Sequence, residues 1–139
     1  FDPVGADDVA RVRKALSPVR TPLALFGGGH VGRAIVQTLL PLPFEVLWID
    51  SRDEIFPDGL PEQVRCEHSS PVQAAVDDLP PGSRVLIMSF SHAEDLEVVA
   101  ACLRRQRLHH DLPFVGLIGS ATKRARFEKR LRERRDESR

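Results

Sequence analysis

The fold is decided by the stretch Leu23-Ala24-Leu25-Phe26-Gly27-Gly28-Gly29-His30-Val31-Gly32. A short apolar strand is followed at once by a G-x-G-x-x-G turn and then by an apolar-periodic helix, which is the context that makes this glycine motif informative. In such a βαβ unit Gly27 allows the tight turn, Gly29 lets a phosphate group approach the backbone, and Gly32 lets the helix pack on the strand. The N–H groups at the start of the helix would then point at an anion.

A second apolar strand supports this interpretation. Residues 44–49 read Phe-Glu-Val-Leu-Trp-Ile and are followed by Asp50, which stands 23 positions after Gly27. An acidic residue about 20 positions past the glycines is expected to hold a ribose hydroxyl. Arg52 follows closely and could meet a phosphate instead, so the choice of nucleotide stays open. The alternative is a strand-turn-helix whose glycines serve only packing.

The rest of the chain alternates strands with helices. Further apolar strands are expected at residues 64–66, 85–88 and 114–118. This alternation predicts parallel βαβ units with right-handed crossovers. We therefore expect an α/β fold: a Rossmann-like doubly wound parallel sheet of about five strands in the order 3-2-1-4-5, with helices on both faces. Residues 22–139 would form this domain, and residues 1–21 would form a helix and linker that packs on the domain's edge or continues from a longer chain.

Apolar spacing and capping residues predict which helix faces are buried. Serine capping boxes are expected to begin helices at Ser70 and Ser91. The helix at about residues 30–40 should bury a face formed by Val31, Ala34, Ile35, Thr38 and Leu39. The helix after Ser91 should bury Leu96, Val99, Ala100 and Leu103.

Composition narrows the class of protein. The 139 residues carry a formal net charge of zero, which argues against a general nucleic-acid binder. No apolar run approaches the ~20 residues of a membrane span, and no signal-peptide pattern opens the chain, so we expect a cytoplasmic protein without membrane contact. Cys66 and Cys102 belong to no metal-ligand motif, so no metal site is expected. Residues 120–139 carry a net charge of +5, and residues 45–79 carry a net charge of −7. These segments are either solvated faces or surfaces on which a partner docks.

The sheet order predicts where a ligand would bind. In such folds the ligand lies beyond the carboxyl ends of the strands, where the strand order reverses between strands 1 and 4. The glycine turn should therefore face residues 89–92, with residues 119–122 alongside. His30 and His92 would come near one another, either to hold a polar ligand or as solvated side chains.

The last helix offers a second candidate anion site. It opens Ser120-Ala121-Thr122-Lys123-Arg124, with basic residues where a helix start disfavours cations. Either an anion is held there, or Ser120 is a plain N-cap and the basic residues are solvated. The sequence shows no catalytic constellation, and this favours a role without turnover.

Four blocks, residues 26–32, 46–52, 91–96 and 116–127, resemble the C-terminal Rossmann-like domain of the xanthine dehydrogenase accessory family (XdhC-like). The resemblance implies a molybdenum-cofactor chaperone. It would bind the molybdopterin cofactor while a cysteine desulfurase supplies sulfur, and would deliver it to xanthine dehydrogenase. It also implies a preceding half with a cofactor-binding cysteine, so the chain is expected to be part of a longer protein. Phe90 stands where a histidine is expected in many relatives.

The candidate cofactor-binding residues combine the glycine turn, the acidic strand end and the two later loops. They are Gly27, Gly28, Gly29, His30, Val31, Gly32, Asp50, Arg52, Ser89, Ser91, His92, Gly119, Ser120, Thr122 and Lys123.

Two other functions remain open from the sequence. The first is an oxidoreductase or redox-sensor domain that binds NAD or NADP, since one fold supports many functions. The second is a protein-interaction module with a degenerate nucleotide pocket, in keeping with the opposed charged segments. A homodimer is compatible with each of these functions.

Overall fold

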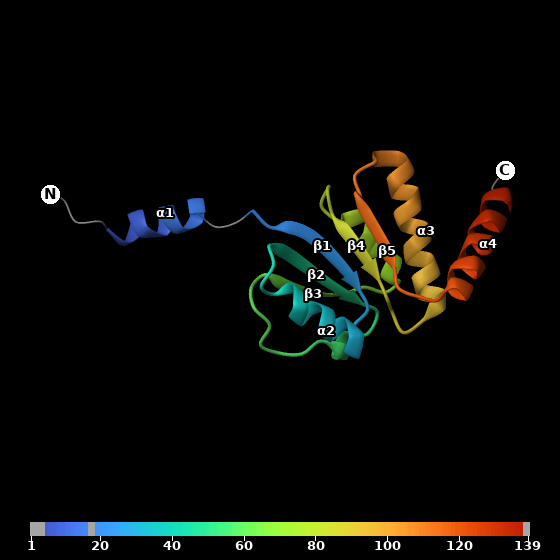
Figure 1. The fold of residues 1–139 in the computed structure, drawn as a ribbon, viewed down its shortest axis with the longest axis horizontal. Coiled ribbons are helices and arrows are strands. Elements are labelled where there is room, and N and C mark those ends of the chain that lie inside the picture. Colours follow the sequence, from blue (N-terminus) through green and yellow to red (C-terminus); the bar gives the residue numbers. More distant parts are fainter. Residues whose placement is uncertain (1–4, 17–18, 138–139) are drawn as a thin grey trace.

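The computed structural model describes residues 5–16 and 19–137. Its centre is a sheet of five parallel strands in the order β3-β2-β1-β4-β5, as the sequence predicted (Figure 1). The strands are β1 (Thr21–Phe26), β2 (Phe44–Asp50), β3 (Val64–His68), β4 (Arg84–Ile87) and β5 (Phe114–Leu117). The helices are α1 (Ala6–Leu16), α2 (His30–Leu39), α3 (His92–His109) and α4 (Ala121–Glu137), with short 3₁₀ helices η1 (Asp53–Ile55) and η2 (Val72–Asp78).

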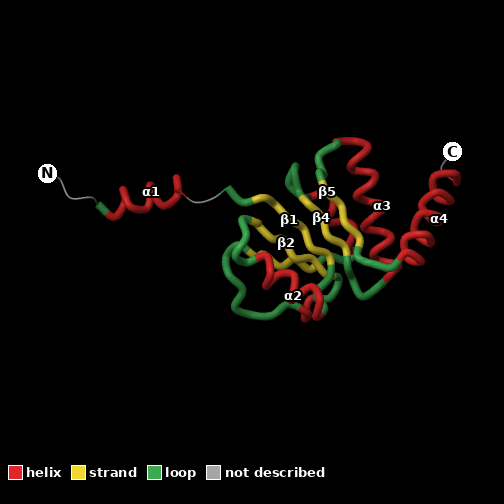
Figure 2. The backbone as a smooth tube through the Cα atoms, in the orientation of Figure 1, coloured by secondary structure: helices red, strands yellow, loops and turns green. Residues whose placement is uncertain are grey.

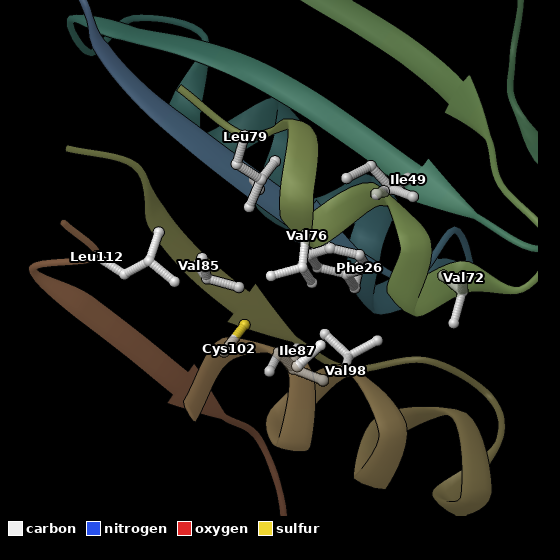
Figure 3. Close-up of a cluster of buried hydrophobic side chains, with 13 residues drawn as sticks. Phe26, Ile49, Val72, Val76, Leu79, Val85, Ile87, Val98, Cys102 and Leu112 are labelled. Atoms are coloured by element: carbon white, nitrogen blue, oxygen red, sulfur yellow. The ribbon is translucent and has the colours of Figure 1, made fainter. Parts of the chain in front are cut away.

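Alternate side chains of β1 belong to two separate hydrophobic cores, because successive residues of a strand point to opposite faces of the sheet. Ala24 and Phe26 join a cluster with η2 and α3, which Figure 3 shows with Val76, Val98 and the buried strand residues. Leu23 and Leu25 join a second cluster under α2, around Trp48. Helices therefore cover both faces, and β1 is buried from both sides as expected for a central parallel strand.

The buried face of α2 differs from the expectation. Gly32 and Val36 are buried and Ile35 and Leu39 are partly buried, whereas Val31 is 59% exposed. Ala34 and Thr38, which were also expected inside, are exposed. Gly32 is the physical reason. A Cβ at this position would overlap the Gly27 carbonyl oxygen, so only a glycine can lie this close to the turn, and α2 is rotated to place Gly32 there. Close packing at one position thus sets the rotation of the whole helix.

The buried face of α3 is also rotated from the one predicted. Leu96 and Ala100 are buried as expected, but Leu103 is 45% exposed. The buried positions include Asp95 and Arg105, which apolar spacing cannot identify. Arg105 is buried because its guanidinium donates to both carboxylate oxygens of Asp111 and to the Val76 carbonyl. Charged partners therefore determine this face together with apolar residues.

The two predicted capping boxes have different outcomes. Ser91 caps α3, because its Oγ accepts the Glu94 N–H at 3.3 Å. The prediction at Ser70 is wrong: the segment is the 3₁₀ helix η2, its N-cap is Pro71, and no side chain bonds to the cap. Pro71 thus takes the cap position in place of Ser70.

Figures 1 and 2 show α1 away from the sheet, so it does not pack on the domain's edge. Residues 17 and 18, between α1 and β1, lie outside the described residues. Within the described ranges, no helix has the length and apolar character needed to cross a membrane.

Candidate functional site

The glycine turn is held between the ends of β2 and β4. Gly27 has a φ of +131°, a conformation that favours glycine. Its N–H donates to the Ile49 carbonyl at 2.9 Å, and its carbonyl accepts the Trp48 indole N–H at 2.8 Å. A Cβ on Gly27 would overlap the Met88 carbonyl at the end of β4. Backbone from both neighbouring strands therefore fixes the turn.

The start of α2 presents backbone donors to open space. Gly29 is its N-cap, without a side-chain hydrogen bond at the cap and without an acidic residue in the first turn. A Cβ on Gly29 would meet no heavy atom within 4 Å, and His30 and Val31 are exposed. The first N–H groups of a helix lack intrahelical acceptors and carry partial positive charge. An anion has both room and donors here.

Asp50 is buried at the end of β2, with 2% of its surface exposed. One carboxylate oxygen accepts the Gly28 N–H at 2.7 Å and Nη2 of Arg52 at 3.1 Å. The other accepts the Arg52 N–H at 2.8 Å and Nε at 3.0 Å. Burial alone would raise the pKa of this carboxyl, but the hydrogen bonds from Arg52 and Gly28 outweigh it and hold the pKa below its usual 3.8. Asp50 is an ionised clamp between the glycine turn and Arg52.

The segment after β2 folds back over the turn. Ile55 lies against Gly28, with its Cγ2 and Cγ1 atoms 2.7 and 2.8 Å from the position that a Cβ on Gly28 would take. The Ile55 carbonyl accepts Nη2 of Arg33 at 3.1 Å, which attaches this segment to α2. The Arg52 guanidinium lies over the Phe90 ring, 4.2 Å from its centroid. Side chains from the ends of β2 and β4 thus meet.

A buried ion pair organises the β4 side. One oxygen of Asp95 accepts the Ser89 N–H at 2.8 Å, and the other accepts the Lys123 ammonium at 2.7 Å. Lys123 also donates to the Ile118 carbonyl at 3.1 Å. The sequence predicted that Lys123 either helps to hold an anion or is solvated, whereas its ammonium is engaged inside the protein. The pair joins the loop after β4 to the start of α4.

The start of α4 has an ordinary cap. Ser120 Oγ accepts the Lys123 N–H at 3.2 Å, and Thr122 and Gly119 are exposed. Of the two predicted anion sites, only the start of α2 has no capping side chain. The loop after β4 is closed on itself, because Ser89 Oγ accepts the Ser91 N–H and donates to the Ser91 carbonyl.

The structure brings the candidate residues of β1, β2 and β4 to one edge of the sheet. Gly28 bonds to Asp50, and Gly27 adjoins Met88 and Ser89. His30 and His92 are both exposed, and among the described residues no hydrogen bond links them.

Three further side chains shape the site and were not predicted. They are Ile55, Phe90 as the partner of Arg52, and Asp95 as the partner of Lys123. Asp95 carried a sequence signal, since it stands four residues after the capping Ser91. The position of Ile55 depends on how a polar, irregular segment folds back, and no local pattern encodes that.

Two other features lie away from this edge. A groove of about 570 Å³ runs between α3 and α4, with Ala100, Leu103 and Leu131 among its lining residues. Cys102 is fully buried, and burial raises the pKa of its thiol to about 12, so it serves as a packing residue of the core.

A family model and one curated relative match nearly the whole chain. Residues 23–139 match the family model described as the XdhC Rossmann domain. The chain is 30% identical over 138 residues to the Uncharacterized protein YqeB of Escherichia coli K12, covering 96% of this chain but 24% of that protein. It therefore spans about a quarter of the length of that curated relative.

A solved structure described as a xanthine dehydrogenase from Bacillus halodurans has a similar fold. It superposes with a TM-score of 0.66 at 20% identity, over 79% of this chain and 32% of the other. At that identity the likeness supports the fold. The family match over residues 23–139 leads to the conclusion that the chain belongs to the XdhC Rossmann domain family.

Proposed function

We propose that this chain is an accessory module that binds the molybdenum cofactor during the maturation of xanthine dehydrogenase and releases it without turnover. The observation that carries the proposal is the uncapped start of α2, where Gly29 faces open space. Membership of the XdhC Rossmann domain family supports the link to xanthine dehydrogenase. Partners of the module would be that enzyme and a cysteine desulfurase, and a homodimer is compatible with this role.

The residues at the start of α2 fit the phosphate group of a pterin cofactor. The N–H groups of His30, Val31 and Gly32 have no intrahelical acceptor, and no carboxylate in the first turn repels an anion. The polar side chains of Ser91 and His92 lie after β4, on the side away from Asp50. We expect them to contact the organic part of the ligand.

A role in holding and releasing also fits the chemistry of the chain. The buried thiol of Cys102, with its pKa raised to about 12, is unsuited to carrying sulfur. Burial also raises the pKa of the Cys66 thiol in β3. Sulfur would therefore reach the held cofactor from the partner desulfurase.

The test is anaerobic equilibrium dialysis of the chain against molybdenum cofactor, followed by transfer of bound cofactor to apo xanthine dehydrogenase. Gly29→Asp places a carboxylate at the N-cap, where it should support the helix but repel the phosphate. We expect this variant to keep its melting temperature and to lose about tenfold or more in affinity.

The matched control adds a charge to the same helix away from its start. Gln37→Glu, on the exposed side of α2, should bind as the unaltered chain does. Equal affinity of Gly29→Asp and Gln37→Glu would contradict the site, and absence of cofactor binding by the unaltered chain would contradict the function.

A further inference from the structure

We infer that Arg52, Ile55 and Phe90 form a cover that keeps adenine dinucleotides away from the glycine turn and Asp50. The site would then take phosphate ligands whose organic part lies toward β4 and β5. This inference rests on the proposed function in one respect, because it takes the start of α2 as the phosphate site. It goes beyond it by naming the class of ligand that the site rejects and the residues that reject it.

Ile55 occupies the space where adenosine would lie. In a doubly wound sheet the ribose and adenine of a dinucleotide extend from the glycine turn over the end of the second strand. Here the Ile55 side chain packs on Gly28 so closely that even a Cβ on that glycine would lie 2.7 Å from it. The Arg33 guanidinium bonds to the Ile55 carbonyl and holds this segment against α2. No gap remains between Ile55 and the turn for a ribose.

Asp50 has no acceptor left for a ribose. Its two oxygens already receive the Gly28 N–H and three donors of Arg52, at 2.7 to 3.1 Å. The bonds from Arg52 Nε and Nη2 join two opposite charges and are stronger than a bond from a neutral hydroxyl. A ribose hydroxyl would have to displace the guanidinium to reach this carboxylate. The acidic strand end that suggested ribose binding instead anchors the cover.

Phe90 completes the cover from the opposite side. Since β1 lies between β2 and β4, a contact between residues that follow β2 and β4 passes over the end of β1. The Arg52 guanidinium and the Phe90 ring make such a contact at 4.2 Å. Phe90 is 63% exposed, so it is not part of either core. Gly29 is not covered in this way, because nothing lies within 4 Å of the position of its Cβ.

The cover can be tested by titrating NAD and NADP separately into the full chain and into the double variant Arg52→Ala/Ile55→Ala. This variant removes the two guanidinium bonds to the Asp50 carboxylate, while the bonds from the backbone N–H groups of residues 28 and 52 stay, and it opens the space above Gly28. We expect weak dinucleotide binding by the unaltered chain and a gain of about tenfold or more in the variant. The control Leu42→Ala/Arg65→Ala removes an exposed leucine and an exposed arginine elsewhere, and should gain nothing.

Phe90→Ala provides a second variant that removes only an exposed ring and should fold normally. It should gain dinucleotide affinity in the same direction, by a smaller factor. Tight NAD or NADP binding by the unaltered chain would overturn the inference, as would folded variants that gain none. The proposed function is judged separately by cofactor binding to the unaltered chain, so the two can fail independently.

Discussion

Gly29 and Gly32 are three residues apart, yet they do different things. A Cβ on Gly32 would overlap the Gly27 carbonyl, whereas one on Gly29 would meet nothing within 4 Å. We expect Gly32→Ala to lower the free energy of unfolding by about 2–4 kcal/mol, because α2 must move off the strand. Gly29→Ala should cost about 1 kcal/mol or less. Urea denaturation measures both, and equal losses would contradict this division of roles.

The Asp50 carboxylate stabilises the fold by an amount that depends on pH. Its pKa in the folded chain lies below 3.8, because the bonds from Arg52 and Gly28 outweigh burial. The stabilisation that the carboxylate provides is therefore complete above the pKa of the unfolded chain. It is lost as the pH falls through the lower pKa of the folded chain. The difference in unfolding free energy between the chain and Asp50→Asn should be largest near neutral pH and shrink below about pH 4. Urea denaturation across this pH range would show a constant difference if the carboxylate played no such part.

At the scale of elements, a buried ion pair joins the start of α4 to α3. The buried residues of α4 are Lys123 and Phe127, and the Lys123 ammonium bonds to Asp95 and the Ile118 carbonyl. Lys123→Met would leave the Asp95 charge buried without its counter-ion, at a cost of about 3–5 kcal/mol. We expect faster hydrogen exchange over α4 in this variant. Lys129→Met alters an exposed lysine of the same helix and should change neither property; equal exchange in both variants would count against this role for Lys123.

The sequence predicts which strands and helices form better than it predicts which face each helix turns toward the sheet. Alternating strands and helices predict the five-stranded sheet and its order. The rotation of α2 could not be read from apolar spacing, because Gly32 has no apolar side chain yet must face the strand. In α3, the burial of Arg105 depends on its bonds to Asp111 and to the Val76 carbonyl of η2. Both partners lie outside α3, so the apolar spacing of the helix does not reveal them. Tertiary contacts therefore determine which face of each helix is buried, and apolar periodicity alone does not.

For the whole molecule, the sequence predicts that the glycine turn and Asp50 meet, because the carboxyl ends of neighbouring parallel strands share one edge, and the structure brings them together there. The chemistry at that edge is less predictable. Asp50 was expected to accept a ribose, and its acceptors are filled by Arg52 and Gly28. Ile55 and Phe90 carry no motif, and only the folded chain shows that Ile55 lies against Gly28 and that Phe90 lies under the Arg52 guanidinium. The sequence thus predicts which candidate binding residues meet more readily than which of their hydrogen-bonding groups stay free for a ligand.

The central claim is that the cofactor's phosphate is held at the start of α2, outside the cover. The most direct test is an NMR titration of the chain with molybdenum cofactor under anaerobic conditions, following the backbone amide resonances. We expect the largest shifts at Gly29, His30 and Val31, with little change at Ile55. Shifts centred on residues 50–56, or none at the start of α2, would contradict it.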